Sequence, residues 1–318
     1  MDKIRQPSRV LVVGAGTMGH SIAQVFAQAG LTVDLADTNA EVLEMAVRRI
    51  EANLSTIKEA EHSSGAETTT DIKNVLKLVK PTTDLSSVTN KAEIVFEAVY
   101  ESVEAKQEVF DLLEEHIPTE TIIASNTSVL DLFAETKLSH PERLVCAHWF
   151  SPAHIVPLVE VAGGPATEEH VVTRTVAFLE SVGKRPLVMR KFVPGFIANR
   201  IMMAMADAAE ELLNSGAATP EEIDYAVKTS VGVRLGVVGI FQSLDFNGLD
   251  LIAGDRPLDE LPTYLRTKIE NGDLGVKTGR GFYEYENDSQ LETLKRRDRS
   301  YLAALRALEE SCGFRPIH

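Results

Sequence analysis

Residues 10–19 read V-L-V-V-G-A-G-T-M-G, and this stretch decides the fold of the chain of 318 residues. Four apolar residues that favour strands run directly into three glycines at the spacing G-x-G-x-x-G. Apolar residues follow at helical spacing, namely Ile22, Ala23, Val25 and Phe26. The segment therefore predicts a strand, a glycine turn and a helix.

Each glycine of this turn has its own expected task. Gly14 makes the tight turn, Gly16 lets backbone N–H groups approach a pyrophosphate, and Gly19 lets the helix pack closely on the strand. The open N-terminus of the helix then faces the phosphates. We expect these glycines to bind a dinucleotide together with the intervening Thr17 and Met18.

An acidic residue ends the next expected strand, residues 31–37, which follows Gly30 at the end of the helix. Asp37 lies 18 residues beyond Gly19 (37 − 19). A carboxylate at this place can accept hydrogen bonds from the ribose hydroxyls of adenosine, and it repels a 2′-phosphate. Since residues 38–41 contain no arginine, we expect NAD rather than NADP. An ordinary βαβ unit with an incidental acid is the alternative.

The composition is that of a globular protein, with 44% hydrophobic and 25% charged residues and a length that suits two domains. A net charge of −15 (32 − 47) argues against nucleic acid or an anionic membrane as partner. The first residues do not resemble a signal peptide, so we expect a cytoplasmic protein. Two cysteines, Cys146 and Cys312, form no metal-ligand cluster, and no metal is expected.

Alternating strand and helix patterns continue to about residue 190. We expect strands at 94–98, 121–124 and 144–148, helices at 40–60 and 103–116, and an exposed polar turn at 61–71. This alternation predicts a mostly parallel sheet covered on both faces. The remaining pattern is nearly all helical from Phe196 onward. The fold class is therefore α/β: a Rossmann dinucleotide-binding domain, 1–191, followed by an all-α domain, 192–318.

Two motifs follow expected strands at the edge where open α/β sheets bind ligands. The first is S-N-T-S at residues 125–128, whose hydroxyls and amides would point at the nicotinamide. Capping of a helix N-terminus explains the same residues equally well. The second motif, C-A-H-W-F-S-P, places His148 at a strand end, 12 residues before Glu160 (160 − 148).

A histidine beside a carboxylate suits the oxidation of an alcohol. Hydride can leave carbon only if the hydroxyl proton is removed, and a histidine with a pKa near neutrality performs that task. Glu160 would fix the tautomer of His148 and stabilise the imidazolium. Taken alone, His148 reads as a structural histidine, whereas the glycine fingerprint upstream favours a catalytic one.

With these motifs in order, the sequence resembles the L-3-hydroxyacyl-CoA dehydrogenase family over essentially its full length. The shared motifs are G-A-G-T-M-G, F-E-A-V-Y-E (96–101), S-N-T-S, H-W-F-S-P with L-V-E-V, P-G-F-I-A-N-R (194–200) and G-V-K-T-G-R-G-F-Y (275–283). The resemblance implies that His148 is the catalytic base and Glu160 its partner. It also implies that Ser128 and Asn199 hydrogen-bond the reacting oxygen.

The same resemblance assigns further residues and a partner. Glu101, Lys106 and Lys277 match positions that line the cleft for cofactor and substrate. The helical domain is implied to mediate a homodimer and to close over a small-molecule substrate, either an acyl-CoA or a hydroxy acid.

Three departures from the family concern the substrate. Ser151 stands where acyl-CoA members carry an asparagine amide close to the nicotinamide, and His154 stands where they typically carry proline. Residues 57–67 hold Lys58 as the only lysine or arginine, against three glutamates, whereas acyl-CoA members carry several lysines there. As a hypothesis, His154 holds a substrate carboxylate; a surface-loop histidine is the alternative.

The sequence therefore predicts NAD-dependent oxidation of the 3-hydroxyl of a 3-hydroxyacyl-CoA, such as 3-hydroxybutyryl-CoA. The alternative is the same chemistry on a small 3-hydroxy acid without CoA. A more remote alternative is a non-catalytic NAD-binding protein of the kind recruited as a lens crystallin.

Overall fold

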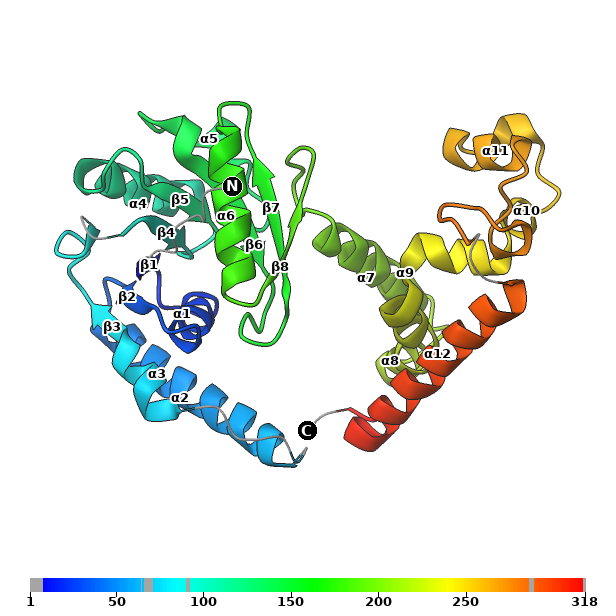
Figure 1. Cartoon of the computed structure of the whole chain (residues 1–318), viewed down its shortest axis with the longest axis horizontal. Coiled ribbons are helices and arrows are strands. Elements are labelled where there is room, and N and C mark those ends of the chain that lie inside the picture. The colour runs from blue at the N-terminus through cyan, green and yellow to red at the C-terminus, as the bar shows by residue number, and fades with distance from the viewer. Residues whose placement is uncertain (1–7, 64, 66–70, 90–91, 286–288, 317–318) are drawn as a thin grey trace. The chain divides into compact units, whose positions relative to one another are not determined.

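The computed structural model describes residues 8–63, 65, 71–89, 92–285 and 289–316. Its contacts divide the chain into two compact units, Met1–Met203 and Ala204–His318, both drawn in Figure 1. The first unit is α/β and the second is helical. The expected fold class, a Rossmann domain followed by an all-α domain, is confirmed.

The first unit is built on a sheet of eight strands in the order β3-β2-β1-β4-β5-β6-β7-β8. All neighbours are parallel except β6 and β7. The strands are β1 (Arg9–Val13), β2 (Thr32–Ala36), β3 (Val79–Thr82), β4 (Ile94–Glu97), β5 (Ile122–Ser125), β6 (Leu144–Trp149), β7 (Leu158–Gly163) and β8 (Arg185–Val188). The order 3-2-1-4-5-6 is that of dinucleotide-binding sheets, and its switch point lies between β1 and β4.

Helices cover both faces of this sheet (Figure 1). They are α1 (Gly19–Gln28), α2 (Ala40–Ser63), α3 (Ile72–Leu78), α4 (Val103–His116), α5 (Leu132–Glu135) and α6 (Glu169–Ser181). Side chains of β1 alternate between two hydrophobic cores, with Val10 and Val12 on one face and Leu11 and Val13 on the other. A continuous apolar run is what a strand buried on both faces requires.

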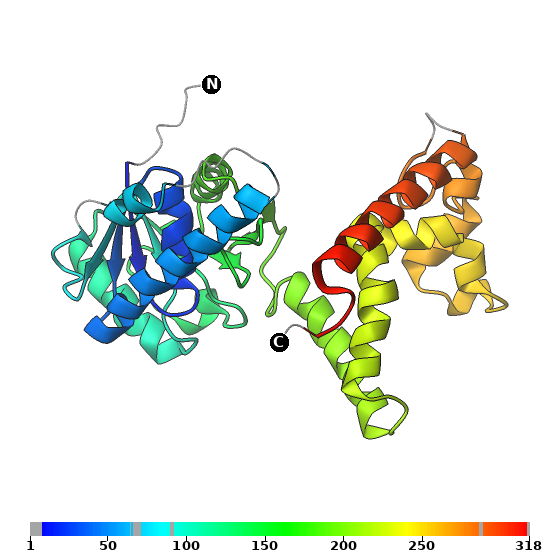
Figure 2. The same ribbon diagram turned by 90° about the horizontal axis from the view of Figure 1, so that it is seen from below.

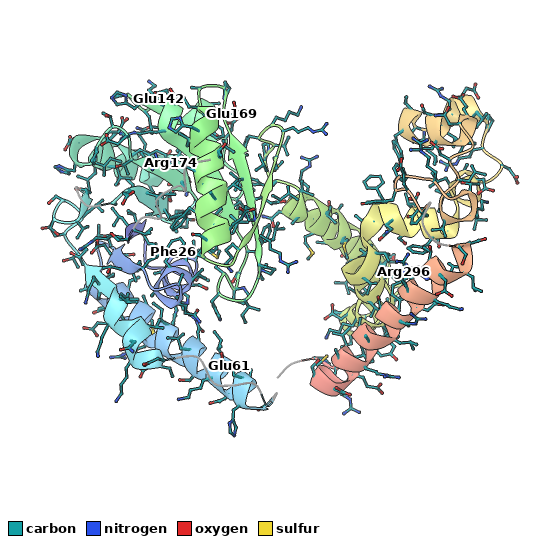
Figure 3. All side chains as sticks on the ribbon, viewed as in Figure 1. Phe26, Glu61, Glu142, Glu169, Arg174 and Arg296 are labelled. Carbon is teal, nitrogen blue, oxygen red and sulfur yellow. The ribbon has the colours of Figure 1, made fainter. Side chains whose placement is uncertain are left out.

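Phe26 of α1, labelled in Figure 3, forms the centre of an aromatic cluster in the first core. Its ring centroid lies 4.8 Å from that of Phe96, 5.2 Å from Phe178 and 5.7 Å from Trp149. Rings from β4, β6 and α6 thereby fix α1 against the sheet, and with it the glycine turn that precedes the helix.

The glycine turn is sterically constrained at two of its three glycines. Gly14 has φ +94°, and a Cβ there would lie 2.6 Å from the carbonyl oxygen of Ala98. A Cβ on Gly19 would lie 1.7 Å from the carbonyl oxygen of Gly14. Around Gly16, in contrast, no described protein atom lies within 4 Å of the Cβ position. The first and third glycines pack the turn, and the second leaves space beside the backbone.

The structure differs from the sequence expectations at several elements. The strands β3, β7 and β8 and the helices α3 and α6 were not expected. β3 (V-K-P-T) and β8 (R-P-L-V) lie at the edges of the sheet and contain proline and charged residues, which weaken a strand pattern. Gly30, with φ +86°, follows the C-cap of α1 by one residue. Most of the expected polar turn at 61–71 lies outside the described residues.

The second unit contains most of α7 (Ala198–Asn214) and the helices α8 (Pro220–Ala226), α9 (Gly232–Asn247), α10 (Leu249–Ala253), α11 (Thr263–Glu270) and α12 (Gln290–Cys312). Helix α12 packs along α9, as Figure 2 shows. A small core gathers Leu249, Ala253, Leu261 and Leu265. The buried Asp245 accepts hydrogen bonds from the N–H groups of Phe282 and Tyr283 and thereby fixes the G-R-G-F-Y turn.

We predict that Gly19→Ala destabilises the first unit, because its Cβ has no room against Gly14. The free energy of unfolding should fall by about 1–3 kcal/mol, as for other overpacked sites. The measurement is urea unfolding followed by the fluorescence of Trp149, the one tryptophan of the chain, which lies in this unit. Gly16→Ala is the matched control, and an equal loss in both variants would contradict the steric argument.

Candidate functional site

His148 and Glu160 face each other across the antiparallel pair of β6 and β7. The imidazole Nδ1 lies 3.1 Å from Glu160 Oε2, and the two side chains are 3% and 1% exposed. Because a carboxylate only accepts, Nδ1 carries the proton and donates it, which leaves the lone pair of the neutral ring on Nε2. The chain reversal at β7, which the sequence analysis did not identify as a strand, creates this pair.

The second carboxylate oxygen of Glu160 is also engaged. Oε1 accepts hydrogen bonds from the N–H groups of Ile197 and Ala198, each at 3.0 Å. These groups open α7, where backbone N–H groups lack partners within the helix and the helix dipole favours a negative charge. Glu160 therefore ties the start of α7 to the imidazole of His148.

Asn199 and two aromatic rings surround the imidazole of His148. Asn199 Nδ2 lies 3.5 Å from Nε2. The ring of Phe196 stacks on the imidazole with centroids 4.6 Å apart, and the ring of Phe150 meets it edge-on at 4.5 Å. The structure thus brings His148, Glu160 and Asn199 together, with the imidazole held in one orientation.

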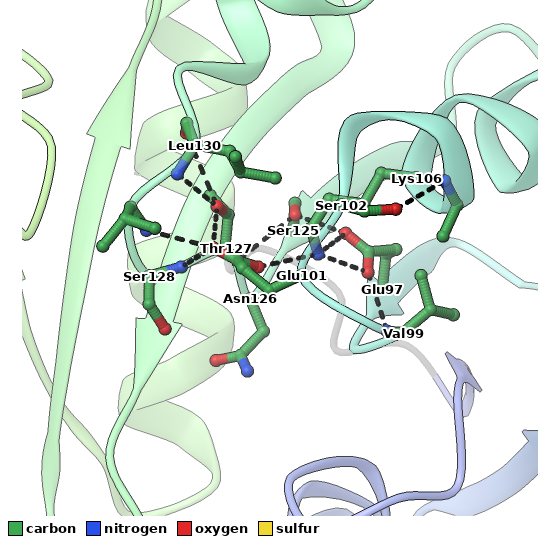
Figure 4. Close-up of polar contacts among 12 residues, drawn as sticks. Glu97, Val99, Glu101, Ser102, Lys106, Ser125, Asn126, Thr127, Ser128 and Leu130 are labelled. Atoms are coloured by element: carbon green, nitrogen blue, oxygen red, sulfur yellow. Dashed lines mark hydrogen bonds and ion pairs between the residues drawn. The ribbon is translucent and has the colours of Figure 1, made fainter.

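The S-N-T-S loop after β5 is held by Glu101, as Figure 4 shows. Glu101 Oε1 accepts hydrogen bonds from Thr127 Oγ1 at 2.7 Å, from Ser128 N at 2.7 Å and from Val129 N at 3.0 Å. Burial alone would raise the pKa of Glu101, but these donors and the nearby Lys106 hold that pKa below its ordinary value. The carboxylate is therefore a charged anchor for the loop.

Glu97, at the end of β4, is a second carboxylate under the same loop. It is fully buried and accepts from Ser125 Oγ, from Val99 N at 2.8 Å and from Lys106 Nζ at 2.8 and 3.0 Å. Lys106 Nζ also lies 3.3 Å from Glu101 Oε2. One lysine thus bridges two carboxylates.

Lys106 therefore occupies a different place from the one expected. It is 0% exposed and lies behind the S-N-T-S loop, and it does not line the cavity described below. Sequence reasoning singled out Lys106 but missed Glu97 as its main partner. The signal was present, since the quoted motif F-E-A-V-Y-E contains both glutamates.

A cavity of about 950 Å³ opens at the switch point between β1 and β4. It extends from the glycine turn and the end of β2 to the S-N-T-S loop. Among its lining residues are Gly14, Gly16, Thr17, Met18, Asp37, Glu101, Asn126 and Ser128. Cavities of this size hold small molecules and cofactors, and the open space at Gly16 lets a ligand approach the backbone.

Asp37 lies at one end of this cavity and is fixed by the backbone. Its Oδ2 accepts from Ala15 N at 2.8 Å, and its Oδ1 accepts from Asn39 N at 3.0 Å. Each carboxylate oxygen has capacity for a further donor, such as a ribose hydroxyl. The open glycine turn and this carboxylate together fit NAD.

At the opposite end of the cavity, Ser128 is positioned through its backbone. Its N–H donates to Glu101, and its carbonyl oxygen accepts from Gly195 N at 3.2 Å. The loop that carries Ser128 is thereby linked to the segment that leads into α7. Ser128 lines the cavity, so it lies where it can contact a ligand.

His154 is held by two helices of the first unit. Ser21 Oγ accepts from His154 N at 3.0 Å and lies 2.8 Å from His154 Nδ1. Asn53 Nδ2 lies 3.5 Å from the same Nδ1. Since the hydroxyl and the amide both donate toward Nδ1, that atom is an acceptor, and the neutral ring carries its proton on Nε2. Burial, with His20 and Lys184 nearby, lowers the pKa of His154.

Ser151 is exposed, in the loop between β6 and β7. Lys184 fixes this loop, since its Nζ donates to the carbonyl oxygens of Ala153 and Val156, at 2.5 and 2.9 Å. The same Nζ lies 5.3 Å from the ring centre of Trp149. Burial lowers the pKa of Lys184 to about 8.

Lys277 belongs to the helical unit and forms an ion pair with Asp250 there. Its expected contact with the cofactor stays a prediction.

Cys146 is buried beside Ala162 and Phe196, and burial raises the pKa of its thiol far above the ordinary value. Within the described ranges no group of three or more His, Cys, Asp or Glu side chains could hold a metal ion. No described helix has the length and apolarity to cross a membrane.

We predict that Lys106→Met destabilises the first unit strongly, because it leaves two neighbouring carboxylates without their cation. Loss of one partner from a buried ion pair costs about 3–5 kcal/mol. Lys277→Met, at a half-exposed pair in the other unit, is the control and should cost about 1 kcal/mol or less. Urea unfolding of both variants tests this, and a loss at Lys106 no larger than at Lys277 would contradict it.

Two family models match the chain. Residues 9–192 match the NAD-binding domain of 3-hydroxyacyl-CoA dehydrogenase, and residues 195–285 match the C-terminal domain of the same family. A probable 3-hydroxybutyryl-CoA dehydrogenase of Bacillus subtilis is 35% identical, over 87% of this chain and 97% of that protein.

Relatives with other substrates match over a similar length. The 5-formyl-3-hydroxy-2-methylpyridine 4-carboxylate 5-dehydrogenase of Mesorhizobium japonicum is 30% identical, over 94% of this chain and 98% of that protein. Among solved structures, a 3-hydroxyacyl-CoA dehydrogenase of Archaeoglobus fulgidus matches with a TM-score of 0.75 and 28% identity, over 95% of this chain and 99% of the other. Together with the cavity that fits NAD, these matches show that the chain belongs to the 3-hydroxyacyl-CoA dehydrogenase family of NAD-dependent oxidoreductases.

Proposed function

We propose that the chain oxidises the 3-hydroxyl of a 3-hydroxyacyl-CoA, such as 3-hydroxybutyryl-CoA, with His148 as the general base. The observation that carries the proposal is the buried pair of His148 and Glu160, which leaves the Nε2 lone pair beside Asn199. A base in this state is ready to accept a proton from an alcohol. The match to 3-hydroxyacyl-CoA dehydrogenases over both units supports this substrate class.

In this mechanism His148 Nε2 takes the hydroxyl proton of the substrate. Glu160 stabilises the imidazolium that forms, and its bonds to the start of α7 keep it in place. Asn199 and Ser128 hydrogen-bond the reacting oxygen. NAD⁺, when bound, supplies the acceptor for the hydride that leaves the substrate carbon.

The glycine turn and the cavity walls would hold the cofactor. Residues 14, 16 and 19 and the neighbouring Thr17 and Met18 are assigned to the pyrophosphate, and Asp37 to the adenosine ribose. Glu101 borders the nicotinamide end, and Lys106 acts through Glu101 and the S-N-T-S loop rather than by direct contact.

We expect His148→Ala and Glu160→Gln to lower turnover while NAD binding is nearly retained, since neither residue lines the cavity. A general base contributes about 10²- to 10⁴-fold, and that is the expected loss for His148→Ala. NADH formation at 340 nm gives turnover, and a fluorescence titration gives cofactor affinity. Full activity of His148→Ala would overturn the assignment of the base.

A small 3-hydroxy acid without CoA is a second candidate substrate, and this candidate rests on the state of His154. Ser21 and Asn53 bind His154 Nδ1 and fix the ring so that a neutral His154 presents a donor at Nε2. In this candidate function that donor binds an oxygen of the substrate carboxyl group, and Ser151 lies in the same loop. The Mesorhizobium relative is named for a substrate without CoA.

The two substrate classes are separated by comparing 3-hydroxybutyryl-CoA with free 3-hydroxy acids at equal concentration. Turnover of the CoA ester supports the first proposal, and turnover of free acids alone supports the second. In the second case His154→Ala should raise KM for the acid by about 5- to 10-fold, the value of one hydrogen bond, and leave cofactor affinity unchanged. A protein that binds NAD but turns over neither class would match the non-catalytic alternative.

We further propose that the functional form is a homodimer. Helix α7 has no buried residue in the single chain, and several of its large apolar side chains are exposed, namely Ile201, Met202, Met203, Leu212 and Leu213. Apolar surface on this scale is typical of a helix that packs against a second copy. The cytoplasmic location expected from the sequence stays a prediction.

A further inference from the structure

Asn126, the second residue of the S-N-T-S loop, touches both the strand of His148 and the cofactor cavity. The residue is 8% exposed. The carboxamide Oδ1 accepts from the backbone N–H of Trp149, the residue after His148, at 2.8 Å. The same residue lines the cavity, as Glu101 and Ser128 do. Figure 4 shows it below the loop, directed away from the two carboxylates.

The contact with Trp149 replaces a missing strand neighbour. β5 pairs with β6 only as far as Ser125 and Cys146, whereas β6 continues to Trp149. Beyond Ser125 no backbone of β5 is left to accept the buried N–H of Trp149. An unpaired buried N–H is costly, so Asn126 Oδ1 completes the hydrogen bonding at the point where His148 leaves the sheet.

The other end of the carboxamide has no protein partner. Nδ2 carries two N–H donors, and no hydrogen bond from it is formed within the described part of the chain. Because the group is planar, fixing Oδ1 on Trp149 restricts where Nδ2 can point. Nδ2 is open to solvent on the cavity wall, so a ligand that displaces water there must supply an acceptor for it.

We propose that Asn126 is a positioning residue, whose Nδ2 donates to an oxygen of the nicotinamide riboside half of NAD while its Oδ1 holds the backbone beside His148. The inference rests on the proposed role of His148 as base. In this arrangement the carboxamide of Asn126, a single rigid group, connects the reacting end of the cofactor to the backbone beside the base. A shift of either end is thereby transmitted to the other.

Two variants separate the two ends of the carboxamide. Asn126→Ala removes both the acceptor for Trp149 and the donors to the cavity. Asn126→Asp has nearly the same shape, keeps the acceptor and removes the donors. Asp also serves as the second variant if Ala does not fold.

Three probes are titrated against each variant: NADH, ADP-ribose, which lacks the nicotinamide, and ADP, which lacks the whole nicotinamide riboside. Binding is followed through Trp149, the one tryptophan of the chain, whose indole is 2% exposed. The emission maximum of the free protein reports on the backbone contact. Turnover at saturating NAD⁺ is measured separately.

We expect both variants to weaken NADH binding by about 5- to 10-fold, the value of one hydrogen bond to the ligand, with ADP affinity within about twofold of the unmodified protein. A loss with NADH alone places the acceptor on the nicotinamide, and a loss with ADP-ribose as well places it on the ribose. The emission maximum should shift to longer wavelength in Asn126→Ala only. Turnover at saturating NAD⁺ should fall in Asn126→Ala by about 10-fold or more.

Equal losses for NADH and ADP, or no loss for either, would overturn the cofactor contact. An unshifted emission maximum with full turnover in Asn126→Ala would overturn the positioning of His148. Failure of the proposed function gives a different result, since it shows as normal turnover in His148→Ala. The ratio of NADH to ADP affinity in the Asn126 variants does not depend on that outcome.

Discussion

The site depends on one carboxylate, that of Glu160, which accepts hydrogen bonds from two separate parts of the chain. Its Oε2 accepts from the imidazole of His148, and its Oε1 accepts from two N–H groups at the start of α7. A carboxylate at 1% exposure is stable only with such partners. Glu160 therefore sets both the orientation of His148 and the point where α7 starts. The antiparallel pairing of β7 with β6 places Glu160 opposite His148.

A second shared element supports the opposite wall of the site. Glu97 ends β4, and Glu101 lies in the segment that follows it. The two carboxylates accept hydrogen bonds from Ser125, Thr127 and Ser128 of the S-N-T-S loop. The backbone N–H of Asn126 donates to the carbonyl oxygen of Glu97. Lys106 lies between the two carboxylates and offsets their repulsion. The loop has no regular structure, yet the backbone N–H groups of Asn126, Thr127 and Ser128 all have acceptors.

Local sequence was sufficient for the glycine turn, the parallel strands around it and the place of Asp37 directly after β2. These features follow from residues adjacent in the chain, where apolar runs and glycines have direct steric meaning. Local sequence was insufficient for β7, because L-V-E-V-A-G carries a glutamate whose burial makes sense only opposite His148. The place of Lys106 depends on Glu97 in the same way, since a buried lysine can be recognised only with its partner. The resemblance to the family identified His148, Glu160, Ser128 and Asn199 as site residues. The tautomer of His148 and the hydrogen bonds between Ser21 and His154 could be assigned only from the structure.

The contrast between the two thiols has a practical consequence. Cys146 lies fully buried on β6, and burial raises the pKa of its thiol and so disfavours the thiolate that electrophiles attack, whereas Cys312 on α12 is half-buried. A maleimide dye should therefore label the native protein once, in the helical unit, without removal of either cysteine. Such a dye gives the helical unit a fluorescent reporter of its own, in addition to Trp149 of the α/β unit.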